Sequence, residues 1–160
     1  MSGRADETVA FAEMAWKRFD DSVKDLNEKE VDWRIAPEAN NIRWILTHIS
    51  WEWNLRVQQV LKADPSYQPK DWPEDYIGNT TYSLEKITSD ISRAREAGLK
   101  GLSSLKSVDL DADIPLWGTT KKRGFGVSNY ISELNHHTGQ IAFIRGCITR
   151  RRSKEPEFLK

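Results

Sequence analysis

The chain has 160 residues, with 24 basic and 24 acidic side chains and a formal net charge of zero. This length suits one domain, which we expect to span residues 1–160. Balanced charge gives no long-range attraction to nucleic acid or to anionic membranes, so we expect neither as a partner. The single cysteine excludes an internal disulfide bond, and no segment approaches the ~20 apolar residues of a membrane span. We therefore expect a soluble, cytoplasmic protein.

Apolar residues recur at helical spacing in the first third of the chain. Between residues 7 and 26 a series of apolar residues is spaced three or four positions apart throughout, which predicts a helix with one buried face. Asn40 and Asn41 predict the N-cap of a second helix over residues 42–63. Because that segment is apolar on nearly every side, it is expected to be the most enclosed helix.

The second half of the chain adds two further helices. Residues 64–82 hold three prolines and no periodicity, which predicts a long connection. Ser83 is a good N-cap for a third helix that reaches about residue 105. Residues 107–126 predict an irregular loop or a short hairpin, and a fourth helix follows from Ser128 to about residue 150. The fold class is therefore all-α, a four-helix bundle with a crossover connection between helices 2 and 3.

Two histidines interrupt the apolar faces of helices 2 and 4. His137 replaces an apolar residue on the inward stripe of the fourth helix, and Glu133 lies one turn before it. His136 falls on a more polar side and is interpreted as the outer histidine. His48 lies on the same side of the second helix as its aromatic residues, with Glu52 one turn away. Buried polar groups without partners cost roughly 1–3 kcal/mol, so these side chains need partners.

Two explanations fit the buried histidines. In the first, His48 and His137 form hydrogen-bonded pairs with Glu52 and Glu133 inside the core. In the second, they bind a metal together with a carboxylate. Spacing by itself favours the paired arrangement. A di-iron arrangement through Glu133 and His136 is a further geometric option, but the acidic partners that it needs on other helices are not evident.

Two motifs resemble the DinB-like family of metal-binding four-helix proteins. Residues 41–52 read Asn-Ile-Arg-Trp-Ile-Leu-Thr-His-Ile-Ser-Trp-Glu, and residues 133–141 read Glu-Leu-Asn-His-His-Thr-Gly-Gln-Ile. The group is similar to the bacillithiol transferases and the mycothiol-dependent maleylpyruvate isomerases. Its pattern takes one histidine from helix 2 and two, four residues apart, from helix 4. Carried over, the implied metal ligands are His48, Glu133 and His137, with glutamate in place of the middle histidine.

The resemblance favours the metal explanation and implies a divalent transition metal, namely zinc, nickel or iron. Two histidines with one carboxylate form a known catalytic zinc set, and the same set suits non-haem iron. Glu52 or Gln140 is expected to orient one of the metal ligands without binding the metal itself. Metal binding is expected to weaken as the pH falls through about 6.5, where free histidine titrates.

Two functions follow from the resemblance. The first is a metal-dependent thiol S-transferase or hydrolase that acts on a small-molecule substrate, with a low-molecular-weight thiol as cosubstrate. The second is a non-catalytic metal-binding or stress-related bundle protein. The glutamate at position 133 favours the second function, whereas His48 and His137 favour the first. A homodimer is expected for either function.

Overall fold

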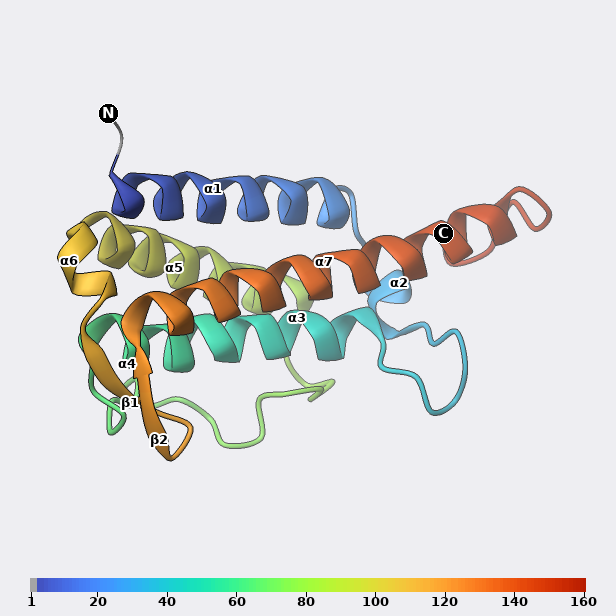
Figure 1. Ribbon diagram of the computed structural model, residues 1–160. Coiled ribbons are helices and arrows are strands. Elements are labelled where there is room, and N and C mark those ends of the chain that lie inside the picture. The colour runs from blue at the N-terminus through green and yellow to red at the C-terminus, as the bar shows by residue number, and fades with distance from the viewer. Residues whose placement is uncertain (1–2) are drawn as a thin grey trace.

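The protein, in a computed structural model that describes residues 3–160, consists mainly of helices with one small antiparallel sheet (Figure 1). Within these residues the elements are, in chain order, α1 (Arg4–Val23), α2 (Glu28–Asp32), α3 (Ile42–Trp51), η1 (Glu52–Arg56), α4 (Val57–Lys62), α5 (Leu84–Ser103), α6 (Ser107–Leu110), β1 (Asp113–Leu116), β2 (Thr119–Lys122) and α7 (Arg123–Arg152). The segments α3, η1 and α4 continue one another and form the predicted second helix.

The four long helical segments of the described chain pack as a bundle. Both α1 and the α3–α4 rod pack against α5 and α7. Figure 1 shows that α3 and α5 run in one direction, while α1 and α7 run in the other. The connection between α4 and α5 therefore returns along the length of the bundle. This arrangement confirms the predicted crossover.

The bundle encloses a hydrophobic core built from the predicted apolar faces. Trp16 is fully buried and makes edge-to-face contacts with Trp53, at 4.7 Å between ring centroids, and with Phe19, at 5.3 Å. Gly98 on α5 lies directly against Trp53, and a methyl group there would come within 2.7 Å of the indole. This glycine therefore lets α5 approach the second helix closely.

The ends of the helices differ from the predicted ends by a few residues. α1 ends at Val23 rather than near residue 26, because Lys24 has an extended backbone and Asp25 has a φ of 57°. The short helix α2 was not predicted. It forms because the side chain of Asn27 accepts hydrogen bonds from the backbone of Lys29 and Glu30, which caps a new helix. The predicted caps Asn41 and Ser83 both form.

The segment before the fourth helix is the short hairpin that was one of two predicted options. Asp113 pairs with Lys122, and Leu116 pairs with Thr119, next to the turn. α7 then begins at Arg123, five residues earlier than predicted. Gly126, the last residue of the predicted loop or hairpin segment, lies instead inside the helix, and a methyl group there would come within 3.0 Å of Leu116 and 3.1 Å of Val60. The two glycines at 124 and 126 allow close packing rather than a loop.

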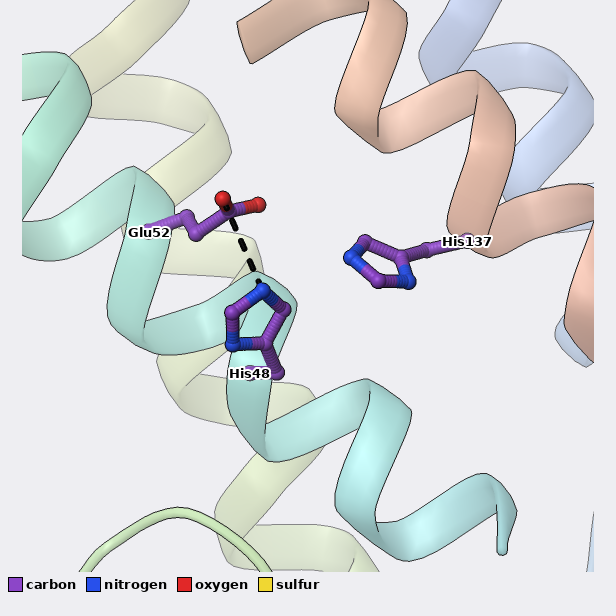
Figure 2. Close-up of side chains that lie close together, drawn as sticks. All are labelled: His48, Glu52 and His137. Atoms are coloured by element: carbon purple, nitrogen blue, oxygen red, sulfur yellow. Dashed lines mark ion pairs between the residues drawn. The ribbon is translucent and has the colours of Figure 1, made fainter. Parts of the chain in front are cut away.

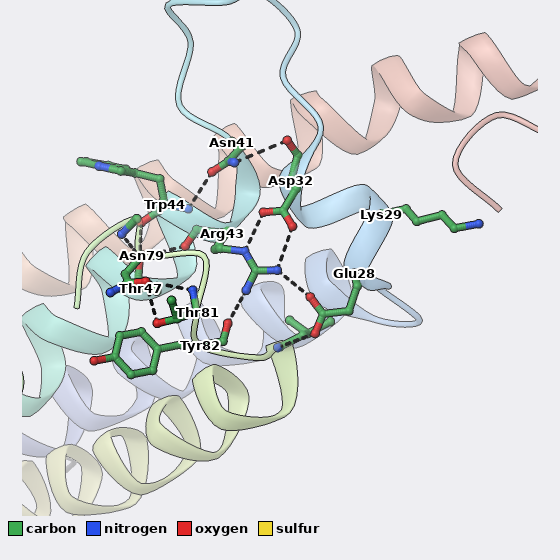
Figure 3. Close-up of polar contacts among 12 residues, drawn as sticks. Glu28, Lys29, Asp32, Asn41, Arg43, Trp44, Thr47, Asn79, Thr81 and Tyr82 are labelled. Carbon is green, nitrogen blue, oxygen red and sulfur yellow. Dashed lines mark hydrogen bonds and ion pairs between the residues drawn. The ribbon is translucent and has the colours of Figure 1, made fainter. Parts of the chain in front are cut away.

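Arg43 joins three parts of the chain at one end of the bundle (Figure 3). Its Nε and Nη2 donate to the two carboxylate oxygens of Asp32 at 2.6 and 2.9 Å, and Nη2 also donates to Glu28 at 2.6 Å. Its Nη1 donates to the backbone carbonyl of Tyr82. The other oxygen of Glu28 accepts from the Leu84 backbone at 2.7 Å. Arg43 therefore ties α2 to the end of the crossover and to the start of α5.

The middle of the crossover is held to α5 by a buried hydrogen bond. Tyr76 is 1% exposed, and its hydroxyl donates to Asp90 Oδ2 at 2.6 Å. Lys86 donates to the same carboxylate at 2.5 Å, and Arg93 contacts its other oxygen. The connection is therefore packed onto the bundle at this point.

Changing Tyr76 to phenylalanine is expected to lower the free energy of unfolding by about 1–2 kcal/mol, because a buried carboxylate loses a donor. Urea denaturation followed by circular dichroism measures this change. Tyr82→Phe is the matched control, since its hydroxyl is exposed and lies 3.4 Å from Asp75. Equal effects of the two variants would show that the Tyr76 hydroxyl does not anchor the crossover.

Candidate metal centre

The two buried histidines meet in the middle of the bundle. His48 comes from α3 and His137 from α7, and their ring centroids lie 4.8 Å apart with the rings nearly perpendicular (Figure 2). His137 is buried and His48 is half-buried. The sequence prediction that both side chains point inward from different helices is confirmed.

Aromatic rings fix the orientation of His48. Trp44 stacks on the imidazole at 4.9 Å between centroids, and Trp51 stacks at 5.9 Å. His48 Nε2 faces Glu52 Oε1 at 3.6 Å, and Nδ1 has no hydrogen-bond partner among the described residues. Stacking, rather than a hydrogen bond, therefore holds this ring.

A hydrogen bond fixes the orientation of His137. Its Nδ1 lies 2.9 Å from Gln140 Oε1, and Gln140 Nε2 lies 3.0 Å from His136 Nε2. An amide oxygen can only accept, so Nδ1 of His137 carries the proton and Nε2 keeps its lone pair. That Nε2 is buried and has no hydrogen-bond partner within residues 3–160. Gln140 thus has the orienting role that the sequence suggested.

The third residue of the cluster is Glu52, which begins the π-helical turn η1. Here the helix widens, and the N–H of Val57 donates to the carbonyl of Glu52, five residues back. His48, Glu52 and His137 each offer a ligand atom within 4.8 Å of the other two. One turn of helix separates His48 from Glu52, which brings both side chains to the same side. π-helical turns occur frequently at functional sites.

Glu133, the carboxylate named as a ligand from the sequence, lies beside this group. Its Oε2 is 3.9 Å from His137 Nε2, and its side chain is 41% exposed. It is not one of the three residues that converge. His136 is exposed and contacts Gln140, as its outer position predicted. From the sequence, Glu52 was expected to lie on the same side as His48 and to orient a metal ligand rather than bind the metal.

The two histidine–glutamate pairs are not hydrogen-bonded, although hydrogen bonds would be expected if they were simple pairs in the core. The His48–Glu52 and His137–Glu133 distances of 3.6 and 3.9 Å exceed hydrogen-bond length. Glu52 Oε2 is also buried without a partner in the described part of the chain. Each such buried atom costs roughly 1–3 kcal/mol. Two imidazoles and a carboxylate with free lone pairs fit a divalent transition metal.

The electrostatics of the site suit metal binding. Burial, and to a lesser degree His137, lowers the pKa of His48 to about 4. Burial also lowers the pKa of His137, against the opposing hydrogen bond from Gln140. Both imidazoles are therefore neutral near pH 7, as ligation requires. Burial, reinforced by the negative charge of Glu133, raises the pKa of Glu52 to about 7. A cation beside Glu52 would favour its ionised form.

A pocket of about 560 Å³ lies beside the cluster and shares Glu52 with it, while neither His48 nor His137 lines it. Its lining consists of Glu52, Glu133 and further residues of the α3–α4 rod, the crossover, the hairpin and α7: Trp51, Arg56, Gln59, Pro65, Pro115, Leu116, Trp117, Gly118, Asn129 and Tyr130. This volume lies in the range of small-molecule sites. No helix of the described chain combines the length and the apolar character needed to cross a membrane.

These features define a class of protein, a helical bundle with a crossover and a histidine–carboxylate cluster between its helices. The chain belongs to the DinB superfamily, whose family model matches residues 12–141. This superfamily often includes metal-binding enzymes. The match confirms the resemblance inferred from the two motifs.

A solved structure supports the fold. The crystal structure of a conserved protein from Enterococcus faecalis matches with a TM-score of 0.66 and 15% sequence identity, over 91% of this chain and 96% of that chain. At this identity the match shows the fold alone. The comparison with curated proteins finds no match.

Proposed function

We propose that the protein is a metal-dependent enzyme that acts on a small molecule in the pocket beside His48, Glu52 and His137. The reaction class that this site supports best is thiol S-transfer or hydrolysis, with a low-molecular-weight thiol or water as nucleophile. The observation that carries the proposal is the convergence of His48, Glu52 and His137, whose ligand atoms lie within 4.8 Å of one another beside a pocket that Glu52 lines.

In this proposal His48, His137 and Glu52 hold the metal. A divalent transition metal supplies Lewis-acid chemistry there, because it lowers the pKa of a water or thiol that binds to it. Gln140 keeps the lone pair of His137 Nε2 directed into the site. The proposal assigns to Glu133, which is partly exposed and lines the pocket, the role of accepting a proton from the incoming nucleophile.

Comparison of Glu52→Gln with Glu133→Gln tests which carboxylate is the ligand. Metal is measured by mass spectrometry in protein purified without added metal, and thiol conjugation is then assayed with a panel of electrophiles. We expect stoichiometric metal in the wild type and in Glu133→Gln, and loss of metal in Glu52→Gln, because only Glu52 is buried with both histidines. The reverse result would make Glu133 the third ligand, as the sequence motif implies. Absence of metal from every preparation would favour a non-catalytic bundle protein.

Metal affinity is expected to fall as the pH drops through about 7, because burial raises the pKa of Glu52 to about that value and ligation requires its ionised form. The imidazoles do not set this limit, because their pKa values are lowered. The sequence-based expectation instead placed this transition at about 6.5, where free histidine titrates. Competition titration with zinc between about pH 6 and 8 measures the effect, with a slope of about tenfold per pH unit below the midpoint. Constant affinity across that range would contradict the role of Glu52.

A further inference from the structure

Arg56 lies in the wall of the pocket without a carboxylate partner. Its Nη1 donates to Gln59 Oε1 at 3.1 Å, and its guanidinium carbon lies 4.9 Å from the centre of the Trp51 ring. It forms no ion pair with any carboxylate of residues 3–160, whereas Arg43 pairs with two. A guanidinium group has five N–H donors in a planar fork. Most donors of Arg56 are therefore free to bind an anion in the pocket.

Arg56 lines the same pocket as Glu52, one of the three candidate metal ligands. Arg56 closes the π-helical turn that Glu52 opens, so both side chains reach the pocket from one turn of helix. Arg56 is also near Tyr130 on α7, where its positive charge opposes the rise in the phenol's pKa that burial causes. The guanidinium therefore lies in the wall of one pocket together with Glu52 and Tyr130.

The hairpin contributes an aromatic residue, Trp117, to the wall of the same pocket. Trp117 occupies the two-residue turn of the hairpin, with a φ of 51°, and Gly118 follows with a φ of 73°. A tryptophan in this left-handed region is strained, and such strain is found preferentially at functional sites. Its indole is 52% exposed, and Nε1 lies 3.4 Å from the Tyr130 hydroxyl. The indole therefore presents a flat apolar surface to a molecule in the pocket.

Charge in the pocket favours an anion once a metal is present. Glu52 and Glu133 are its two acidic wall residues and Arg56 its basic one. A divalent cation would balance both carboxylates, and the charge of Arg56 would remain. Burial beside low-dielectric aromatic walls strengthens the attraction between this charge and an anion.

We propose that this pocket binds a small organic anion, a carboxylate attached to a flat apolar body, with Arg56 pairing the carboxylate and Trp117 covering the body. The inference rests on the proposed function, since it names the substrate class of that same site. It makes Arg56 a specificity-determining residue. Arginine suits this task because its fork binds both oxygens of a carboxylate at once.

Calorimetric titration of the zinc-loaded protein with benzoate, and with benzamide as its neutral counterpart, tests the proposal. We expect the wild type to bind benzoate about tenfold more tightly than benzamide, because a hydrogen-bonded charge pair has about that effect on affinity. Arg56→Gln is expected to abolish the preference, because it weakens benzoate binding far more than benzamide binding. Arg56→Lys, which keeps the charge and loses the fork, is expected to retain part of it. Arg18→Gln is the matched control, because Arg18 is an exposed arginine outside the pocket.

The outcomes separate this inference from the proposed function. A preference for benzoate that survives in Arg56→Gln would overturn the inference, and so would absence of benzoate binding up to about 10 mM, the range expected for so small a ligand. Metal content is measured in the same samples. A stoichiometric metal content, together with benzoate binding that does not depend on Arg56, would overturn this inference and leave the metal proposal standing. Benzoate binding that depends on Arg56 in a protein that never carries metal would support the anion site and refute the metal-dependent chemistry.

Discussion

Replacing His137 by alanine is expected to remove metal from the purified protein almost completely. His137 Nε2 is buried, carries a lone pair directed into the site and has no protein partner within the described residues, so its loss leaves one histidine and one carboxylate. Two donors from a single helix bind a transition metal far more weakly than three from two helices. Mass spectrometry gives the metal content, and the thermal shift caused by a chelator gives the energetic consequence.

His136→Ala is the control for this experiment, since the neighbouring histidine is exposed and contacts the cluster only through Gln140. We expect this variant to retain metal. A chelator should lower the melting temperature of the wild type and of His136→Ala, and should leave that of His137→Ala unchanged. Stoichiometric metal in His137→Ala would show that the ion binds elsewhere.

The second large effect is expected in the core. Trp16→Ala should lower the free energy of unfolding by about 3–5 kcal/mol, because it removes a fully buried indole and leaves a cavity. The indole also makes edge-to-face contacts with Trp53 and Phe19, which add to the loss. Guanidinium denaturation measures the change.

Phe11→Ala on the same helix is the matched control, because its side chain is 42% exposed. Its effect should be about 1 kcal/mol or less. A loss of similar size for Trp16→Ala would mean that α1 contributes little to the core.

Helical periodicity was sufficient to predict the architecture. The stripe that contains Trp16 and Phe19 places α1 against α5 and α7, and the three prolines of the crossover mark its extent. The prediction failed where tertiary packing overrides local preference. Gly126 has the chemistry of a turn, but it lies in α7, where Leu116 and Val60 leave no space for a side chain. No local pattern reveals contacts between residues so far apart in the sequence.

The candidate site could be predicted in part. His48 and His137 stood out because polar residues interrupted apolar faces, and the structure brings them together. The choice between Glu52 and Glu133 could not be made from spacing, since each carboxylate lies four residues from a histidine. Burial separates them, because the Glu52 side chain is 8% exposed and that of Glu133 is 41% exposed. Such a difference depends on how α3 and α7 face each other.

The π-helical turn at Glu52 determines which side chains on the two halves of this helix share a face. A π turn contains about one residue more than an α turn, so the wider turn accommodates an extra residue while the helix on either side keeps its facing. In a regular α-helix the same extra residue would rotate every later side chain by about 100°. Val57 and Val60 would then leave the core. The extra residue thus allows one helix to present a histidine and a glutamate to the bundle centre, an arginine to the pocket and valines to α5 and α7.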